Sequence, residues 1–164
     1  MSAMEGLLLH RNPGGAVGRS ATWVLVVDDE VVVRDLLERF LVLEGYKVMS
    51  AADGLEAVRL FQAHPGTFQA AILDVLMPRM DGRDTFYALR QVDPMLPVLI
   101  MSGFAPGERA DEIIGRPGTN FIHKPFVLGD VLLRLEQLLA QRGGTAAPPA
   151  AAPTTTLRLE GITD

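Results

Sequence analysis

Five short apolar runs, separated by segments with helical periodicity, are the feature that most constrains the fold of this chain. The runs occupy residues 22–27, 46–50, 70–73, 97–101 and 119–123. Runs of this length are typical of strands that are buried on both faces, as in a parallel sheet covered by helices. The alternation therefore predicts a doubly wound α/β fold, (βα)5, whose ligands bind at the carboxyl ends of the strands.

The segments between the runs carry helix signals of uneven strength. An apolar stripe at helical spacing follows the first run, and its members are Val33, Leu36, Leu37, Phe40 and Leu41. Gly45 is expected to end that helix in a left-handed conformation, and Asp53 is expected to cap the next helix. Segment 104–118 contains several Pro and Gly residues, which favour only a short helix there.

Composition restricts the class of protein. The length of 164 residues fits one domain with a real core, and the net charge of −5 argues against a face that binds nucleic acid. The chain has no cysteine, which excludes disulfides and thiolate metal sites. It also lacks an apolar run of about 18 residues, so no membrane span is expected. These features together predict a cytoplasmic protein that does not bind a membrane or nucleic acid directly.

The two ends of the chain differ in composition from its centre. Residues 1–21 lack a sustained periodicity and are predicted to form a flexible leader. Residues 143–164 are rich in Ala, Pro and Thr and are predicted to form a disordered tail. The ordered domain is therefore expected to span 22–142.

Polar and charged side chains follow four of the predicted strands. Asp28, Asp29 and Glu30 come after the first, Asp74 after the third, Ser102 after the fourth and Lys124 after the fifth. In a parallel sheet these strand ends meet at one crevice, where clustered carboxylates would repel one another. A divalent cation would relieve that repulsion, and oxygen ligands without His or Cys favour Mg²⁺.

The same groups suit phosphoryl chemistry. Lys124 offers a positive charge and Ser102 a hydroxyl donor, and both match the oxygens of a phosphoryl group carried on a carboxylate. Asp74 is then expected to be a nucleophile that forms an aspartyl phosphate, while the metal and Lys124 offset the charge of the transition state.

At this point the chain resembles the response-regulator receiver domains of two-component signalling, the CheY-like superfamily. The matching motifs are VLVVDDE at 24–30, AILDVLMPRMDG at 71–82, LIMSG at 99–103 and FIHKPF at 121–126. The resemblance covers roughly residues 22–142. It implies a flavodoxin-like sandwich with strand order 2-1-3-4-5 and phosphorylation of Asp74 by a histidine kinase or a histidine phosphotransfer protein.

The resemblance also implies roles for single residues. Asp29 and Asp74 would bind Mg²⁺ directly, Asp28 through water, and Leu76 through its backbone carbonyl. Ser102 and Phe121 would be the switch pair, and the peptide bond between Lys124 and Pro125 would be cis. Phosphorylation would then change the face formed by the fourth helix, the fifth strand and the last helix, through which the chain could bind a downstream protein or form a homodimer.

Two other functions deserve comparison. A haloacid-dehalogenase-like phosphatase also uses an aspartyl phosphate, but it needs an Asp-x-Asp pair that Asp74-Val75-Leu76 does not provide. A receiver fold could also act as a docking module without phosphorylation. Because no room for an output domain follows residue 142, the sequence predicts a stand-alone regulator that is not an enzyme.

Overall fold

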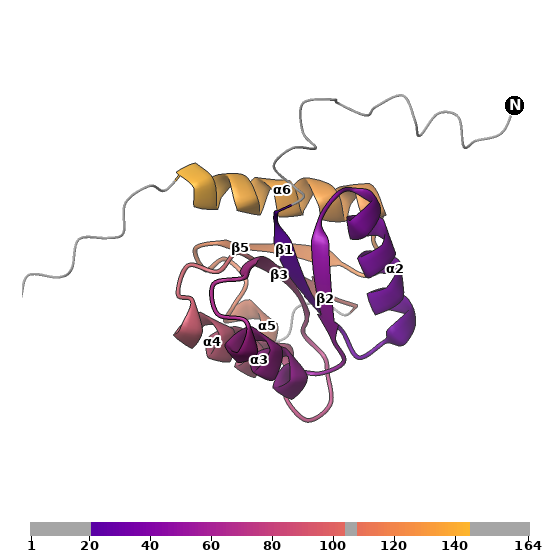
Figure 1. The fold of residues 1–164 in the computed structure, drawn as a ribbon. Coiled ribbons are helices and arrows are strands. Elements are labelled where there is room, and N and C mark those ends of the chain that lie inside the picture. The colour runs from indigo at the N-terminus through magenta and orange to yellow at the C-terminus, as the bar shows by residue number, and fades with distance from the viewer. Residues whose placement is uncertain (1–20, 104–107, 145–164) are drawn as a thin grey trace, which may run out of the picture.

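The computed structural model describes residues 21–103 and 108–144. A five-stranded sheet of order β2-β1-β3-β4-β5 forms its centre, and all neighbouring strands run parallel (Figure 1). The strands are β1 (Trp23–Val27), β2 (Lys47–Ala51), β3 (Phe68–Asp74), β4 (Val98–Ser102) and β5 (Thr119–His123). The predicted flavodoxin-like arrangement and its strand order are thus confirmed.

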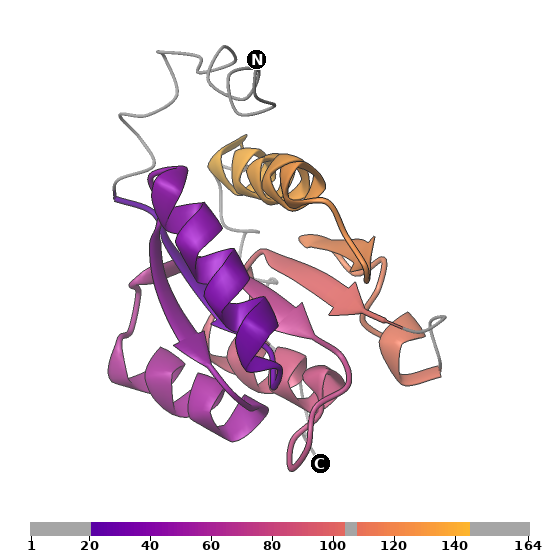
Figure 2. The ribbon, with the colours of Figure 1, turned by 90° about the vertical axis from the view of Figure 1, so that its right-hand side faces the viewer.

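Helices cover both faces of this sheet. They are α2 (Val31–Leu43), α3 (Gly54–Ala63), α4 (Gly82–Val92), α5 (Glu108–Asp111) and α6 (Leu128–Gly144). Figures 1 and 2 show α2 and α6 on one face and α3, α4 and α5 on the other. This arrangement gives the sheet two apolar layers and leaves the carboxyl ends of its strands uncovered.

The alternation of side chains along β1 explains why its sequence is apolar without a break. Val24 and Val26 pack into the layer under α2 and α6, whereas Leu25 and Val27 pack into the layer under α3 and α4. All four side chains are fully buried. Burial of a valine or leucine side chain contributes about 1.5–3 kcal/mol, so a polar residue at any of these positions would weaken the sheet.

The helix ends follow the local signals of the sequence. Gly45 has a φ of 95°, a left-handed conformation that side chains disfavour, and it follows the end of α2 as predicted. The Asp53 side chain accepts a hydrogen bond of 2.9 Å from the N–H of Glu56, which confirms the predicted cap of α3. Asp81 caps α4 in the same way through the N–H of Asp84.

Two predictions about the helices need correction or refinement. Leu36 was expected on the buried stripe of α2, yet it is 46% exposed. Leu37 and Leu41 are the buried centre of that stripe, and Leu36 lies about 100° around the helix from Leu37. The helix expected within 104–118 is reduced to the single turn of α5, in keeping with the Pro and Gly residues around it, and residues 104–107 lie outside the described part.

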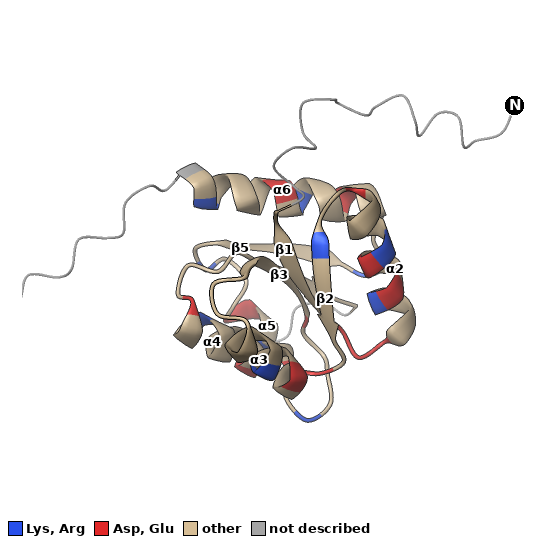
Figure 3. Ribbon diagram, in the orientation of Figure 1, with Lys and Arg blue, Asp and Glu red and all other residues tan. Residues whose placement is uncertain are grey.

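Charged side chains are concentrated on the helices and loops, as Figure 3 shows. The loop that leads from β1 into α2 is acidic, since it contains Asp28, Asp29 and Glu30. No helix within the described residues is long and apolar enough to cross a bilayer. Almost all of the predicted leader and tail lies outside the described residues, so both remain predictions.

Candidate functional site at the carboxyl ends of the strands

The uncovered edge of the sheet collects the polar residues that the sequence singled out. Asp28 directly follows β1, Asp74 is the last residue of β3, Ser102 is the last of β4, and Lys124 directly follows β5. The parallel register pairs Asp74 with Met101, so the ends of β3 and β4 lie almost level. The predicted convergence of these four positions on one edge is therefore present.

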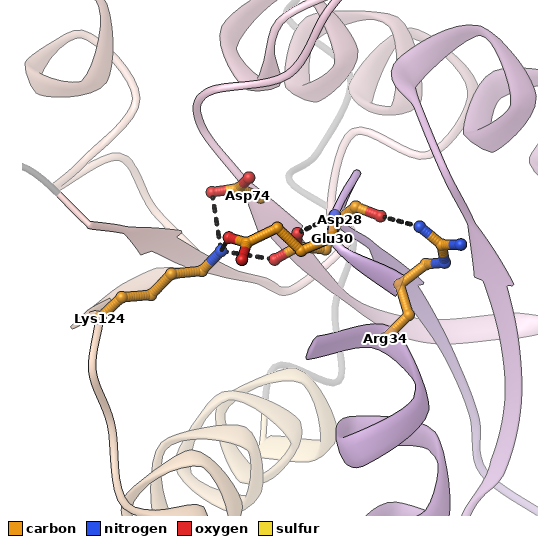
Figure 4. A network of polar contacts seen from close by, with 5 residues as sticks. All are labelled: Asp28, Glu30, Arg34, Asp74 and Lys124. Carbon is orange, nitrogen blue, oxygen red and sulfur yellow. Dashed lines mark hydrogen bonds and ion pairs between the residues drawn. The ribbon is translucent and has the colours of Figure 1, made fainter. Parts of the chain in front are cut away.

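Lys124 is the centre of a network of carboxylates at this edge (Figure 4). Its Nζ atom lies 2.7 Å from Oδ2 of Asp28, 3.3 Å from Oε1 of Glu30 and 3.5 Å from Oδ1 of Asp74. The first two contacts are hydrogen bonds, and the third is an ion pair. One ammonium group thus serves three carboxylates that come from two different strand ends.

Hydrogen bonds with main-chain groups and with side chains hold Asp28 in place. Its N–H donates to the carbonyl of Ala51, and its own carbonyl accepts a 2.7 Å hydrogen bond from the guanidinium of Arg34. Its carboxylate accepts from the N–H of Glu30 through Oδ1 and from Lys124 through Oδ2. Asp28 is fully buried, and the two hydrogen bonds to its carboxylate help to offset the cost of burying its charge.

Three carboxylates at the site could hold a metal ion. One oxygen each from Asp28, Asp29 and Asp74 lie within 4.8 Å of one another. Asp28 and Asp74 are buried, whereas Asp29 is exposed. The donor set consists of oxygen atoms alone, which fits Mg²⁺. Both oxygens of Asp28 already accept hydrogen bonds, one from the N–H of Glu30 and one from Lys124.

The site perturbs the ionisation of Asp74. Burial, followed by the neighbouring charge of Asp28, raises the pKa of Asp74 from 3.8 to about 7, although Lys124 opposes the rise. A carboxylate with so unfavourable an environment is typical of functional sites. Burial and the two neighbouring acids, Asp28 and Asp29, thus make the charge of Asp74 costly in spite of Lys124.

The ionisation of Lys124 is shifted in the direction that retains its charge. Burial alone would lower the pKa of the Lys124 ammonium, but its hydrogen bond to Asp28 and the charge of Asp74 outweigh burial. The pKa of Lys124 is therefore raised, and the side chain is a permanent cation at neutral pH.

The loop between β3 and α4 packs closely on the site. The N–H of Gly82 donates to the carbonyl of Val75 over 2.8 Å, and a Cβ at Gly82 would lie 2.3 Å from the carbonyl oxygen of Asp74. Only glycine permits this approach. Leu76 lies at the start of the same loop with its side chain 55% exposed, and this loop would supply the predicted backbone ligand.

Sequence reasoning missed the residues that support the site from outside. Arg34 binds the Asp28 carbonyl, and Arg79 forms an ion pair with Asp53 that links the β3–α4 loop to the start of α3. Arg79 also has a positive φ of 67°, which nothing in its sequence signals. Arg34 follows Glu30 by one helical turn, and that spacing was the only available signal for its position next to the acidic loop.

The two predicted switch residues occupy neighbouring strands. Ser102 is buried, and its carbonyl accepts a 2.8 Å hydrogen bond from the N–H of Lys124. Phe121 is partly buried against the layer under α3 and α4, and its ring meets that of His123 edge to face at 6.4 Å. The peptide bond between Lys124 and Pro125 is cis, as the resemblance implied.

A family model for the response regulator receiver domain matches residues 24–136, from β1 into α6. The chain belongs to this family. Receiver domains of response regulators are signalling proteins of two-component systems and not enzymes, so the haloacid-dehalogenase-like alternative is set aside. Phosphorylation and Mg²⁺ binding are general to the family, whereas the roles of the individual residues in this chain stay predictions.

Known proteins agree with this membership. The transcriptional regulatory protein PrrA of Mycobacterium tuberculosis is 39% identical over 131 residues, which are 79% of this chain and 54% of PrrA. The crystal structure of CheY4 from Vibrio cholerae matches with a TM-score of 0.65 and 31% identity, over 71% of this chain and 98% of CheY4. CheY in the CheX–CheY–BeF3–Mg²⁺ complex from Borrelia burgdorferi matches with a TM-score of 0.66 and 29% identity, over 71% of this chain and 88% of that one.

The chain spans about half the length of the curated relatives it matches. Those relatives are named as transcriptional regulators, so the activity of a whole protein of that kind extends beyond the receiver domain. The prediction of a stand-alone regulator that does not bind nucleic acid therefore remains a prediction.

Proposed function

We propose that this receiver accepts a phosphoryl group on Asp74 from a phosphohistidine of a histidine kinase or a histidine phosphotransfer protein. The position of Asp74 supports this best. Its side chain is only 6% exposed, stands at the carboxyl end of the central strand β3, and has a carboxylate oxygen 3.5 Å from the ammonium of Lys124. An acid placed in this way beside two further acids serves no evident folding purpose, but it suits a phosphoacceptor.

The transfer itself needs little covalent chemistry from the protein. A carboxylate oxygen of Asp74 attacks the phosphorus atom, and the bond between phosphorus and the histidine nitrogen breaks. The electron pair of that bond stays on the imidazole nitrogen, and Asp74 becomes an acyl phosphate. Lys124 and the Ser102 hydroxyl then bind phosphoryl oxygens and offset the negative charge that spreads over them.

Mg²⁺ is the cofactor that fits the acidic residues. Asp29 and Asp74 would bind the ion directly, Asp28 through water, and Leu76 through its backbone carbonyl. When bound, Mg²⁺ supplies positive charge to the attacking carboxylate and to the phosphoryl oxygens. The BeF3–Mg²⁺ complex of the related Borrelia CheY supports a place for this cation in the fold.

The phosphoryl group would act on the output surface through Ser102 and Phe121. It adds about 1.5–2 negative charges beside Ser102. Ser102 would move toward it, and Phe121 would turn into the space that is left. We propose that this movement changes the face formed by α5, β5 and α6, on which a downstream protein or a second copy of the chain would bind.

The same proposal covers the organisation of the chain. The functional domain would be residues 22–142, which contain the whole family match at 24–136. The chain would act as a cytoplasmic regulator that signals by binding a partner. The assignments of a leader at 1–21 and a tail at 143–164 rest on composition.

Incubation of the full chain with Mg²⁺ and phosphoramidate, followed by measurement of intact mass, tests the proposed phosphorylation. We expect one phosphoryl adduct in the wild-type protein and none in Asp74→Asn. Asp35→Asn is the matched control, because Asp35 is an exposed acid of α2 outside the network around Lys124.

The result separates the proposal from its main alternative. An adduct that persists in Asp74→Asn would place the phosphate elsewhere and refute the assignment of Asp74. If wild-type protein binds Mg²⁺ but gains no adduct, the fold serves as a docking module without phosphorylation.

A further inference from the structure

Lys124 has three carboxylate partners in the resting site, and their distances from its ammonium group differ. An ammonium group has three protons and no acceptor. Its hydrogen bonds go to Asp28 at 2.7 Å and to Glu30 at 3.3 Å, whereas Asp74 is the most distant of the three at 3.5 Å (Figure 4). Before phosphorylation, the Lys124 ammonium is therefore shared among three acids, and two of them, Asp28 and Glu30, do not receive the phosphate.

These two hydrogen bonds differ greatly in how easily they can be released. The Asp28 side chain is fully buried and that of Lys124 is 15% exposed, but the Glu30 side chain is 62% exposed. Release of Asp28 would leave a buried carboxylate with one partner fewer, which is costly. Release of Glu30 costs little, because water can replace the lysine at an exposed ion pair.

Local structure gives no reason for the direction of the Glu30 side chain. Glu30 is the N-cap residue of α2, yet its side chain makes no capping hydrogen bond. The corresponding residues of α3 and α4, Asp53 and Asp81, both cap their helices with their side chains. The N–H of Glu30 is fixed by Asp28, and its carboxylate extends to Lys124 across the site.

We propose that Glu30 is a displaceable counter-ion that binds Lys124 in the resting site and competes with the incoming phosphoryl group for it. This inference rests on the proposed function of Asp74. Phosphorylation requires one N–H of the Lys124 ammonium to turn from a carboxylate to a phosphoryl oxygen. The N–H that donates to Glu30 is the one that is released first. Glu30 thereby slows the phosphorylation of Asp74.

Two substitutions of Glu30 separate its contact from its charge. Glu30→Gln removes the charge and weakens the contact. Glu30→Asp keeps the charge, but the side chain is shorter by one methylene group, and aspartate at an N-cap prefers to bond the first turn of its own helix. Asp35→Asn, an exposed acid on the same helix, controls for the loss of one negative charge.

The phosphorylation rate with phosphoramidate and saturating Mg²⁺ is the main measurement. We expect Glu30→Gln and Glu30→Asp both to be about two- to fivefold faster than wild type, the range that an exposed ion pair allows. Asp35→Asn should stay within about 1.5-fold of wild type, since exposed charges outside the contact are largely screened by salt. Urea unfolding of each variant checks that its fold is intact.

Mg²⁺ affinity, measured by calorimetry, provides a readout that does not depend on phosphorylation. Glu30→Asp should bind Mg²⁺ as the wild type does. A tenfold loss of affinity would make Glu30 a metal ligand and overturn the inference. Wild-type phosphorylation rates in both Glu30 variants would overturn it too, as would a slower rate in either.

An increase in Glu30→Gln alone, or an equal increase in Asp35→Asn, would show that charge and not the contact with Lys124 controls the rate. Failure of the proposed function is a separate result, because the wild-type protein would then gain no phosphoryl group on Asp74 at all.

Discussion

Asp74→Asn is expected to stabilise the protein at alkaline pH when divalent cations are absent. Asp74 is buried beside Asp28, and its pKa in the folded protein is raised from 3.8 to about 7. The folded state therefore binds a proton on Asp74 more tightly than the unfolded state does. Stability falls as the pH rises from about 4 through 7. In that window the Asp74 carboxyl of the unfolded protein is already ionised, so folding must either take up a proton on Asp74 or bury its charge. Asparagine has no such proton.

The size of the effect follows from the shift in pKa. A rise from 3.8 to about 7 corresponds to at most roughly 4 kcal/mol of unfolding free energy. The shift already includes the favourable contribution of Lys124, and water at the edge of the sheet screens part of the remainder, so we expect a net gain of about 1–2 kcal/mol at pH 8. At pH 4 the two proteins should be equal within about 0.5 kcal/mol.

Urea unfolding followed by circular dichroism, in EDTA and at several pH values between 4 and 8, measures this difference. The variant should gain on the wild type steadily across the window. Added Mg²⁺ should then stabilise the wild type and reduce the advantage of the variant, since a cation that binds only the folded state stabilises it. Parallel pH profiles of the two proteins in EDTA would refute the reasoning, because Asp74 would then titrate alike in both states.

Two further predictions concern the support of the site. Gly82→Ala should destabilise the protein by about 2–3 kcal/mol in urea unfolding, because the added Cβ would overlap the Asp74 carbonyl oxygen. Its matched control, Gly129→Ala, has open space around the new Cβ and should gain up to about 1 kcal/mol; a similar loss in both variants would contradict the packing argument. Asp53→Ala should cost about 1–2 kcal/mol because it removes the cap of α3. Asp53→Asn keeps a capping oxygen and weakens only the pair with the exposed Arg79, so a cost equal to that of alanine would show that the ion pair, and not the cap, is what matters.

The strands could be predicted from the sequence, because a strand that is buried on both faces is apolar at every position. Val24 to Val27 form an unbroken apolar run since helices cover the sheet on each side. Asp28 and Asp74 could be assigned to one edge for the same reason, since parallel strands end on the same side. Helix faces are recorded less sharply: α2 buries a narrow stripe around Leu37, so Leu36 could not be distinguished from its buried neighbours by spacing.

The pairing of side chains could not be obtained in this way. Sequence reasoning brought Lys124 to the acidic edge but gave no reason for it to lie nearer to Asp28 than to Asp74. Which carboxylate lies nearer to Lys124 depends on the direction and burial of the side chains, and both are determined only when the strands and helices have packed together. Arg79 was missed for the same reason, since it pairs with Asp53, which only the tertiary fold brings near. Arg34 is close to Asp28 in the sequence, but the direction of its side chain toward the Asp28 carbonyl could not be obtained from that spacing.

The proposed cation, the phosphoryl group and Glu30 all change the total charge at the carboxyl edge of the sheet. Asp28, Glu30 and Asp74 contact a single lysine, and Asp29 lies beside Asp28 and Asp74, so negative charge is already in excess before a phosphoryl group arrives. The phosphoryl group carries about 1.5–2 negative charges, whereas its bond to Asp74 removes the charge of that one carboxylate. A divalent cation bound to the acids would offset part of this total, and the departure of Glu30, whose side chain is 62% exposed, toward water would reduce it further. Cation binding and the release of Glu30 would therefore both favour the phosphorylated state, because each relieves repulsion among the negative groups of the site.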